Sequence, residues 1–375
     1  MTSRPGAITI VGIPGNRRVG LFQDALRRAG HSDARVLSWR DVHSGSAAFA
    51  PGDLVRLESP GEDPVLDREL RGVTDATRVE GTGRWYARFT ALARSLGEQV
   101  TGCGATLLDD PADLAVLFDK RRCHEVLTNA GVPVPFALTS GVTEPVRGWA
   151  DLRERMTRAG LERVFVKLAH GSSASGVLAL ATSNAGRVQA ITSVERDARG
   201  RLFNSLRVRK YSTEAEVAAI VDALAPDGLH VERWLPKAAQ HGRSADLRVV
   251  VVRGRATHAV VRTSRSPMTN LHLGGARGDL AAVRAAIANA GGEWGEVLGI
   301  CERAAACFPG FSRVGVDLLP VAGWRRFAVG EVNAFGDLLP GLNGLDGSGA
   351  ESGDTYDAQV AVLLRRTGNQ HDAIA

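Results

Sequence analysis

Hydrophobic and polar residues in the first third of the chain follow a pattern of short strands and amphipathic helices. A β-branched run at 7–12 ends in glycine and leads through a turn into an amphipathic segment at 19–29. A strand, a glycine-containing turn and a helix in this order are typical of the start of an α/β domain. The turn lacks the GxGxxG spacing that a dinucleotide site requires. Further elements are expected as strands at 34–39, 53–57 and 106–108 and as a helix at 83–96.

A second group of elements follows a capped helical segment at 109–131, which is interrupted near Asp119. The run 163–168 predicts a strand with Lys167 near its end, and a Gly/Ser-rich loop at 171–176 then leads into another strand. Backbone N–H groups of such a loop can approach phosphate oxygens, although many ordinary hairpins have the same composition. A strand at 202–211 and a helix at 214–224 complete a compact α+β unit.

The last third begins with a strand at 229–235 and continues as a hairpin. Its strands are expected at 246–253 and 256–263, with Gly254-Arg255 as a two-residue turn that has glycine first. An Ala-rich helical stretch at 280–306 is interrupted by Gly291-Gly292. A final amphipathic helix is expected at 355–366, followed by a flexible tail at 368–375.

Two apolar runs within 313–341 flank Gly323 and carry three oxygen-bearing side chains. Glu331 and Asn333 are two residues apart on one strand and therefore share a face, and a hairpin would place Asp317 opposite Glu331. Carboxylates among Val, Leu and Phe side chains need compensation, which a divalent cation supplies. Oxygen ligands favour magnesium or manganese over zinc. The alternative is an edge hairpin whose acidic side chains are simply solvated.

Composition indicates an ordinary soluble globular protein, with 44% hydrophobic and 23% charged residues among 375. No run of 18 apolar residues predicts a membrane span, and the first apolar run is too short for a signal peptide, so we expect a cytoplasmic protein. A net charge of +5 with scattered basic residues suits an anionic small substrate better than nucleic acid. Reduced structural thiols are expected for the cysteines, which show no CxxC pairing: Cys103, Cys123, Cys301 and Cys307.

Lysine is rare among the 46 basic residues, so each lysine invites a reason, with chance retention on the surface as the alternative. The four are Lys120, Lys167, Lys210 and Lys237. Three arginines of the first group, Arg17, Arg18 and Arg56, lie next to strand ends or turns, where α/β domains tend to place ligands. They could face an anionic substrate, and a solvent-exposed position is an equal alternative for each.

The chain contains an ordered series of nine short motifs. They are FDK (118–120), GVPVP (131–135), VFVK (164–167), GSSASG (171–176), HVERW (230–234), ADLRVVVVRG (245–254), VVRTSRSPMTNLHLGG (260–275), GVDLL (315–319) and EVNAF (331–335). This series resembles the ATP-grasp superfamily, especially its glutathione-synthetase-like and ribosomal-protein glutamate ligase branches. The resemblance covers roughly 112–341. It implies a mixed α/β and α+β chain in which ATP lies between two antiparallel sheets under a flexible lid.

The domains that the resemblance implies follow the three groups of elements. Residues 1–112 would form the Rossmann-like α/β domain that precedes the ATP-grasp domains. Residues 113–230 would form the small lid domain, and 231–367 the C-terminal antiparallel-sheet domain with the metal site.

Carried over residue by residue, the resemblance implies an ATP site with magnesium, or alternatively manganese. Lys120 and Lys167 would contact ATP phosphates, a task that suits a point charge on a flexible stem. The lid loop over the phosphates would include Gly171, Ser172, Ser173 and Gly176. The hinge that binds adenine through its backbone would be Glu232, Arg233, Trp234 and Leu235, with a core position as the alternative for Trp234. Asp317, Glu331 and Asn333 would hold one or two metal ions.

The resemblance also implies the catalytic residues and the activity. Arg262 and Asn270, which match an Arg…Asn-x-x-x-Gly-Gly pattern, would act with Lys167, and the arginine would neutralise an acyl phosphate. Arg248 would bind phosphate, with a surface strand position as the alternative. The implied activity is an ATP-dependent ligase that joins a small-molecule or peptide carboxylate to an amine. The alternatives are a nucleotide-binding accessory protein without ligase chemistry and, from the pI near 9.3 alone, a nucleic-acid-binding protein. No membrane partner is expected, and self-association is left open.

Overall fold

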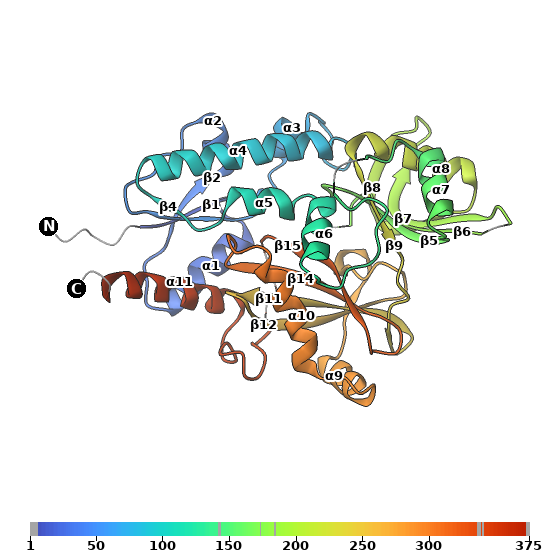
Figure 1. The fold of residues 1–375 in the computed structure, drawn as a ribbon. Helices are drawn as coiled ribbons and strands as arrows, with labels where there is room; N and C mark the ends of the chain where they lie inside the picture. Colours follow the sequence, from blue (N-terminus) through green and yellow to red (C-terminus); the bar gives the residue numbers. More distant parts are fainter. Residues whose placement is uncertain are drawn as a thin grey trace.

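The computed structural model describes residues 7–372 except 142, 143, 173, 184, 336–338 and 340, and it contains three β-sheets in three lobes (Figure 1). The first lobe holds a parallel sheet, and the other two are built on antiparallel sheets. The second lobe lies at one end of the molecule, whereas the first and third lie one above the other. This arrangement confirms the mixed α/β and α+β architecture expected from the sequence.

The first sheet contains four parallel strands in the order β2-β1-β3-β4. Its strands are β1 (Ile8–Gly12), β2 (Arg35–Ser38), β3 (Leu54–Leu57) and β4 (Thr106–Leu107). The helices of this lobe are α1 (Arg17–Arg28), α2 (Trp39–Ser44), α3 (Pro64–Arg71), α4 (Thr82–Gly102) and α5 (Pro111–Leu117). The sequence analysis did not predict α2 and α3, since helices of six and eight residues show little periodicity.

The second sheet contains five antiparallel strands in the order β8-β7-β6-β5-β9. Its strands are β5 (Arg163–Leu168), β6 (Leu178–Thr182), β7 (Val188–Arg196), β8 (Leu202–Tyr211) and β9 (Leu229–Arg233). The helices α7 (Trp149–Arg158) and α8 (Glu214–Leu224), the latter followed by η1 (Ala225–Asp227), accompany it, and their buried residues share one core with the sheet. The sequence analysis missed β7 and α7. The boundary expected at residue 230 falls within β9, which completes this sheet.

The third sheet has the strand order β13-β12-β11-β14-β15, and β10 pairs with β11. Its strands are β10 (Ala239–Gln240), β11 (Arg243–Val252), β12 (Arg255–Ser264), β13 (Ala276–Arg277), β14 (Arg313–Pro320) and β15 (Phe327–Asn333). The remaining helices are α6 (Lys120–Asn129), η2 (Leu271–Leu273), α9 (Leu280–Asn289), α10 (Trp294–Ala306) and α11 (Thr355–Asp372). A continuous core joins α6 and α10 to this sheet and to the first lobe.

The turn between β11 and β12 differs by one residue from the turn expected at Gly254-Arg255. Val252 pairs with Arg255, so the two turn residues are Arg253 and Gly254. Both have positive φ, 49° and 77°. Two positive φ angles define a type I′ turn, whose twist matches that of the flanking strands better than other turns. The prediction of a glycine-first turn was therefore wrong, because Arg253 adopts the left-handed conformation.

Helix interruptions lie where glycine and capping residues predicted them. Asp119 caps α6 through its side chain, and Gly291 at φ 84° separates α9 from α10. The last helix, α11, continues to Asp372, past the start of the tail expected at 368–375. Residues 373–375 lie outside the described part of the chain.

Buried ion pairs fasten the first lobe to the third sheet. Arg313 at the start of β14 donates to Asp109 at 2.7 Å and to the carbonyl of Leu57. Arg56 pairs with Glu58 at 2.6 Å and is only 4% exposed, so neither interpretation of Arg56 from the sequence was right. It is a structural group rather than a substrate ligand or a surface arginine. Of these pairs, Arg313–Asp109 joins the two lobes, and breaking it would leave a buried charge without its partner.

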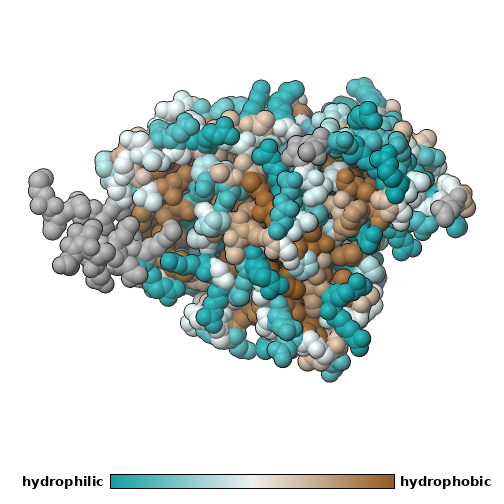
Figure 2. All heavy atoms as spheres, viewed as in Figure 1, coloured by the Kyte–Doolittle hydropathy of each residue, from teal (hydrophilic) through white to brown (hydrophobic). Residues whose placement is uncertain are grey.

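The visible surface is mostly hydrophilic, and the hydrophobic residues that reach it lie mainly in a band across the middle (Figure 2). No helix within the described residues is long and apolar enough to span a membrane.

Candidate functional site

The acidic hairpin has the register expected from the sequence. β14 and β15 pair so that Asp317 lies opposite Glu331, and Asn333 lies opposite Gly315. The Asn333 side chain donates through Nδ2 to the carbonyl of Gly315 at 3.2 Å, which leaves its Oδ1 as an acceptor. The hairpin therefore presents two carboxylates and an amide oxygen, the donor types that magnesium prefers.

Lys120 connects this hairpin to the Gly/Ser-rich loop. It is the first residue of α6, and Asp119 caps the helix through the backbone N–H of Arg121. The Lys120 Nζ donates to Glu331 Oε1 and to the carbonyl of Gly171, both at 2.6 Å. The ammonium group therefore lies between an acid of the third sheet and the loop of the second sheet.

Lys167 forms the second lysine–acid pair of the site. It is near the end of β5, and its Nζ lies 2.6 Å from Glu232 Oε1 on the adjacent strand β9. Burial alone would raise the pKa of Glu232, but the charge of Lys167 and a hydrogen bond from His230 lower this pKa to about 2. Burial likewise opposes the charge on Lys167, whose pKa is nevertheless raised by Glu232 and, more weakly, by Glu331. Both members of the pair are therefore ionised at neutral pH.

Two arginines of the third sheet converge on Asp317. Arg248 lies opposite Asp317 in the pairing of β11 with β14, and its Nε is 3.1 Å from Asp317 Oδ1. Arg262 on β12 reaches the same oxygen through Nη2 at 2.9 Å and bonds Asp246 through Nε at 2.7 Å. The Arg248 side chain is only 12% exposed, so the surface alternative for this residue was wrong.

The Gly/Ser-rich loop between β5 and β6 turns tightly against Leu168. The N–H of Ser175 donates to the carbonyl of Ser172 at 2.9 Å. Gly176 has φ 69°, and a Cβ there would lie 2.6 Å from Leu168 Cδ1, so only glycine fits. Ser173 lies outside the described residues. The carbonyl of Gly171 places one end of the loop beside Lys120.

The hinge residues lie at the end of β9, where the chain passes from the second sheet to the third. The N–H of Arg233 donates to Phe136 and that of Trp234 donates to Arg163, so both donors have protein partners. The Trp234 ring packs against the ring of Phe165, and their centroids are 5.5 Å apart. A bound adenine would therefore have to use the other backbone groups of this segment, including those of Leu235.

Asn270 lies at the start of η2, in the connection between β12 and β13. Strand β11 separates β12 from β14 of the acidic hairpin. Its carbonyl accepts hydrogen bonds from the N–H groups of Leu273 and Gly275. The preceding residue, Thr269, donates its hydroxyl to Asp246, the acid that also binds Arg262. The turn that carries Asn270 is thus fixed to the same acid as the arginine.

The sequence analysis missed Asp246, Lys237 and His230 as members of this site. Asp246 stands two residues before Arg248 and would share its face of a strand, which is a signal the sequence does contain. The only signal for Lys237 in the sequence was that lysine is rare in this chain. His230 stands two residues before Glu232 on β9, so the same i, i+2 spacing was available in the sequence for this contact.

The residues of the hairpin fit a magnesium ion only if other ligands complete its shell. Within the described residues, no group of three His, Cys, Asp or Glu side chains could hold a metal by itself. Asp317, Glu331 and Asn333 supply three oxygen donors, and magnesium usually keeps waters or substrate phosphates in its other positions. The donor set therefore fits a magnesium ion that arrives with a nucleotide phosphate.

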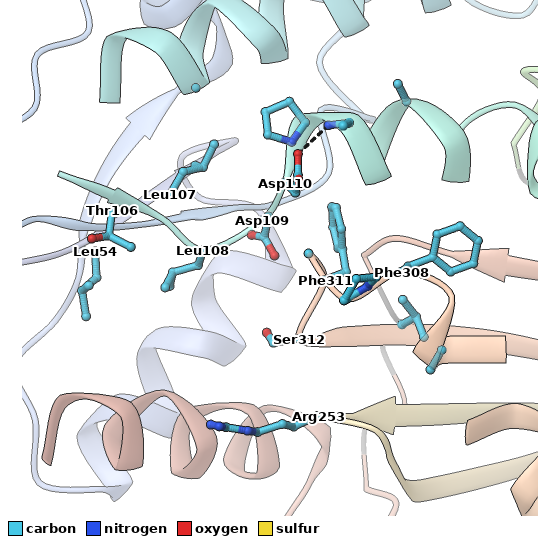
Figure 3. Close-up of a pocket in the computed structure, with 18 of the residues that line it drawn as sticks. Leu54, Thr106, Leu107, Leu108, Asp109, Asp110, Arg253, Phe308, Phe311 and Ser312 are labelled. Carbon is cyan, nitrogen blue, oxygen red and sulfur yellow. Dashed lines mark hydrogen bonds between the residues drawn. The ribbon is translucent and has the colours of Figure 1, made fainter. Parts of the chain in front are cut away.

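A large cavity lies away from these residues, between the first lobe and the third sheet (Figure 3). It has a volume of about 1530 Å³, and Asp109, Phe308, Phe311 and Arg253 are among its lining residues. It contains none of the residues predicted for the site. A much smaller cavity is lined by Lys120, Glu232 and Glu331, together with other residues of the site.

Comparison of this chain with solved structures identifies its fold. No family model and no curated protein matches the chain. D-cycloserine synthetase DcsG is similar at 16% identity and a TM-score of 0.58, over 96% of this chain and 99% of that chain. ATP-grasp ligase PsnB, complexed with minimal precursor, Mg and ADP, is similar at 17% identity and a TM-score of 0.55, over 98% and 99%. Macrocyclase MdnC from Microcystis aeruginosa MRC, bound with precursor peptide MdnA, is similar at 11% identity and a TM-score of 0.50, over 96% and 99%.

At these identities the likeness concerns the fold, and it extends over nearly the whole length of each chain. It agrees with the order of the sequence motifs and with the three lobes described above. The chain therefore has the ATP-grasp fold.

Proposed function

We propose that this protein is an ATP- and magnesium-dependent ligase that joins a carboxylate to an amine through an acyl phosphate. The observation that carries the proposal is the convergence of Lys120, Lys167, Arg248 and Arg262 on acids between the second and third sheets. Each of these mostly buried cations is paired with one of four acids, Glu331, Glu232, Asp317 and Asp246. Ammonium and guanidinium groups gathered in this way suit the phosphates of a nucleotide, and the acids suit the magnesium ion that accompanies them.

The residues can be assigned roles in that reaction. Magnesium held by Asp317, Glu331 and Asn333 would offset phosphate charge when bound. Lys120 and Lys167 would turn from their acids toward the phosphate oxygens, since a flexible ammonium can exchange one anionic partner for another. The loop at 171–176 would exclude water from the phosphates.

The chemistry proceeds in two steps. A carboxylate oxygen of the first substrate bonds to the γ-phosphorus, and the bond from that phosphorus to the bridging oxygen of ADP breaks. The amine then bonds to the carbonyl carbon, phosphate leaves with the electron pair of the C–O bond, and the nitrogen loses a proton. Arg262 and Asn270 would stabilise the negative charge that develops on the carbonyl oxygen and phosphate, and catalysis would be mostly positioning and electrostatics.

We infer a carboxylate-bearing peptide or a small molecule as the first substrate. The solved structures of PsnB and MdnC contain precursor peptides, whereas DcsG is a synthetase of a small molecule. The amine partner would enter beside Asn270.

The test is a screen for ADP release over a panel of carboxylates, including acidic peptides, crossed with amines. Mass spectrometry would then identify the amide. Glu331→Gln should abolish ADP release, whereas Glu351→Gln, at an exposed position, should not change it. If magnesium-ATP binds but no pair of substrates releases ADP, the protein is instead a nucleotide-binding accessory protein.

A further inference from the structure

Lys237 is a mostly buried lysine that the reaction described above does not use. It lies two residues after Leu235, on the segment that leaves the hinge, and its side chain is 10% exposed. Its Nζ donates to Thr269 Oγ1 at 3.0 Å and to the carbonyl of Pro267 at 3.2 Å, and it lies 3.5 Å from Asp246 Oδ2. Two of these contacts are made to the segment that carries Asn270, and the third is made to Asp246 on β11.

Asp246 links this lysine to the arginine of the site. Its Oδ1 accepts from Arg262 Nε, and its Oδ2 accepts from the Thr269 hydroxyl. Arg262 in turn reaches Asp317 through Nη2. A continuous chain of hydrogen bonds and ion pairs therefore runs from Lys237, just after the hinge, to Asp317 of the acidic hairpin.

Because its charged groups are shielded from water, this chain of contacts constrains the positions of the residues that it joins. Lys237 and Asp246 lose almost all contact with water, so each must be compensated by its partners. The Thr269 hydroxyl stands between them, because it accepts from the lysine and donates to the acid. The position of Thr269 fixes the next residue, Asn270, whose carbonyl also closes the turn of η2.

We propose that Lys237 is a positioning residue that holds the Asn270 segment and the Arg262 guanidinium in register through Asp246 and Thr269. The consequence rests on the proposed ligase function and concerns its second step. Without Lys237, ATP would still bind and the carboxylate would still be phosphorylated, because the contacts of Lys120 and Lys167 with Glu331 and Glu232 do not involve Lys237. The acyl phosphate would be poorly shielded and aligned, so water would compete with the amine.

The activity test compares ADP release with amide formation in the full chain. Lys237→Met should lower amide formation at least tenfold, leave the KM for ATP within about twofold and raise the ratio of ADP to amide. Thr269→Val should do the same, whereas Thr269→Ser keeps the hydroxyl and should behave as wild type. Lys210→Met, at an exposed position on β8, is the control for loss of a lysine. An unchanged ratio of ADP to amide in both Lys237→Met and Thr269→Val would overturn the proposal.

A second readout does not depend on ligase activity. Backbone hydrogen exchange of 264–275 in the protein without substrates should accelerate in Lys237→Met and Thr269→Val but not in Thr269→Ser. If no substrate pair releases ADP with the wild-type protein, the proposed function fails while the exchange data still test the constraint. Unaltered exchange in both variants would refute the constraint itself. If Lys237→Met does not fold, the Thr269 pair carries the test alone.

Discussion

Removal of Lys167 gives the sharpest test of the electrostatics of the site. In Lys167→Met, Glu232 would keep its buried position, at 3% exposure, but would lose the cation 2.6 Å away. The lowered pKa of Glu232, about 2 against an ordinary 4.5, corresponds to about 3 kcal/mol of stability at neutral pH. Leaving a buried charge unpaired costs a similar amount, about 3–5 kcal/mol. We therefore expect Lys167→Met to lose about 3 kcal/mol of unfolding free energy at pH 8.

The pH dependence follows from the direction of the shift. In the wild-type protein the pKa of Glu232 is lower in the folded than in the unfolded state, so its contribution exists above pH 4.5 and is lost as pH falls toward 2. In the variant, burial remains and raises the pKa of Glu232 above its ordinary value. The unfolding free energy of the variant is therefore reduced at high pH, where Glu232 is charged, and rises as the acid protonates at lower pH. The difference in stability should therefore shrink from pH 8 to pH 5.

The assay is urea unfolding, measured by circular dichroism at both pH values. Lys167→Met/Glu232→Gln removes both charges and should recover most of the stability lost at pH 8, with little dependence on pH. Lys210→Met, whose lysine is exposed, should be close to wild type at either pH. An equal loss at pH 8 and pH 5, with no recovery in the double variant, would show that the lysine acts through packing and refute the electrostatic account.

Two further predictions concern the fold and the lid loop. Arg313→Met should cost about 3–5 kcal/mol of unfolding free energy, because Asp109 would be left buried without its partner. Urea unfolding measures this loss, and Arg313→Met/Asp109→Asn should recover part of it. Gly176→Ala should cost about 1–3 kcal/mol, since φ is 69° and the new Cβ would meet Leu168. Its ligation rate should also fall, and a wild-type rate would contradict a closing role for the loop.

The sequence predicted the acidic hairpin because the relevant geometry is local. Asp317 and Glu331 lie in neighbouring strands joined by a short turn, and they pair as expected. A bulge contributes to this register, because the pair Leu318–Val329 nearer the turn would otherwise place Asp317 opposite Gly330. The lysines gave a compositional signal, and Lys120, Lys167 and Lys237 all lie at the site, with side-chain exposures of 15%, 15% and 10%. For this part of the molecule, residue type and spacing predicted the residues of the site, but they did not predict the bulge next to Asp317.

The remainder depended on contacts between segments that are distant in the chain. Arg56 looked like a ligand of an anion because it lies near the end of a strand, but its environment includes Gln359 of α11, which sequence periodicity does not locate. Asp246 acquires its role only when β11 lies between β12 and β14. The strand order of a sheet with crossovers is set by packing of the whole core, so the partners of such residues in other segments were not predictable from local patterns.

The central claim is that this site activates a carboxylate with ATP, and isotope transfer tests it most directly. The carboxylate found in the ADP-release screen would be labelled with ¹⁸O at both oxygens and incubated with magnesium-ATP and the amine. The account predicts one labelled oxygen in the inorganic phosphate, because the carboxylate oxygen that attacks the γ-phosphorus leaves with it. Phosphate without label, formed together with the amide, would contradict an acyl phosphate and with it the assignment of this site.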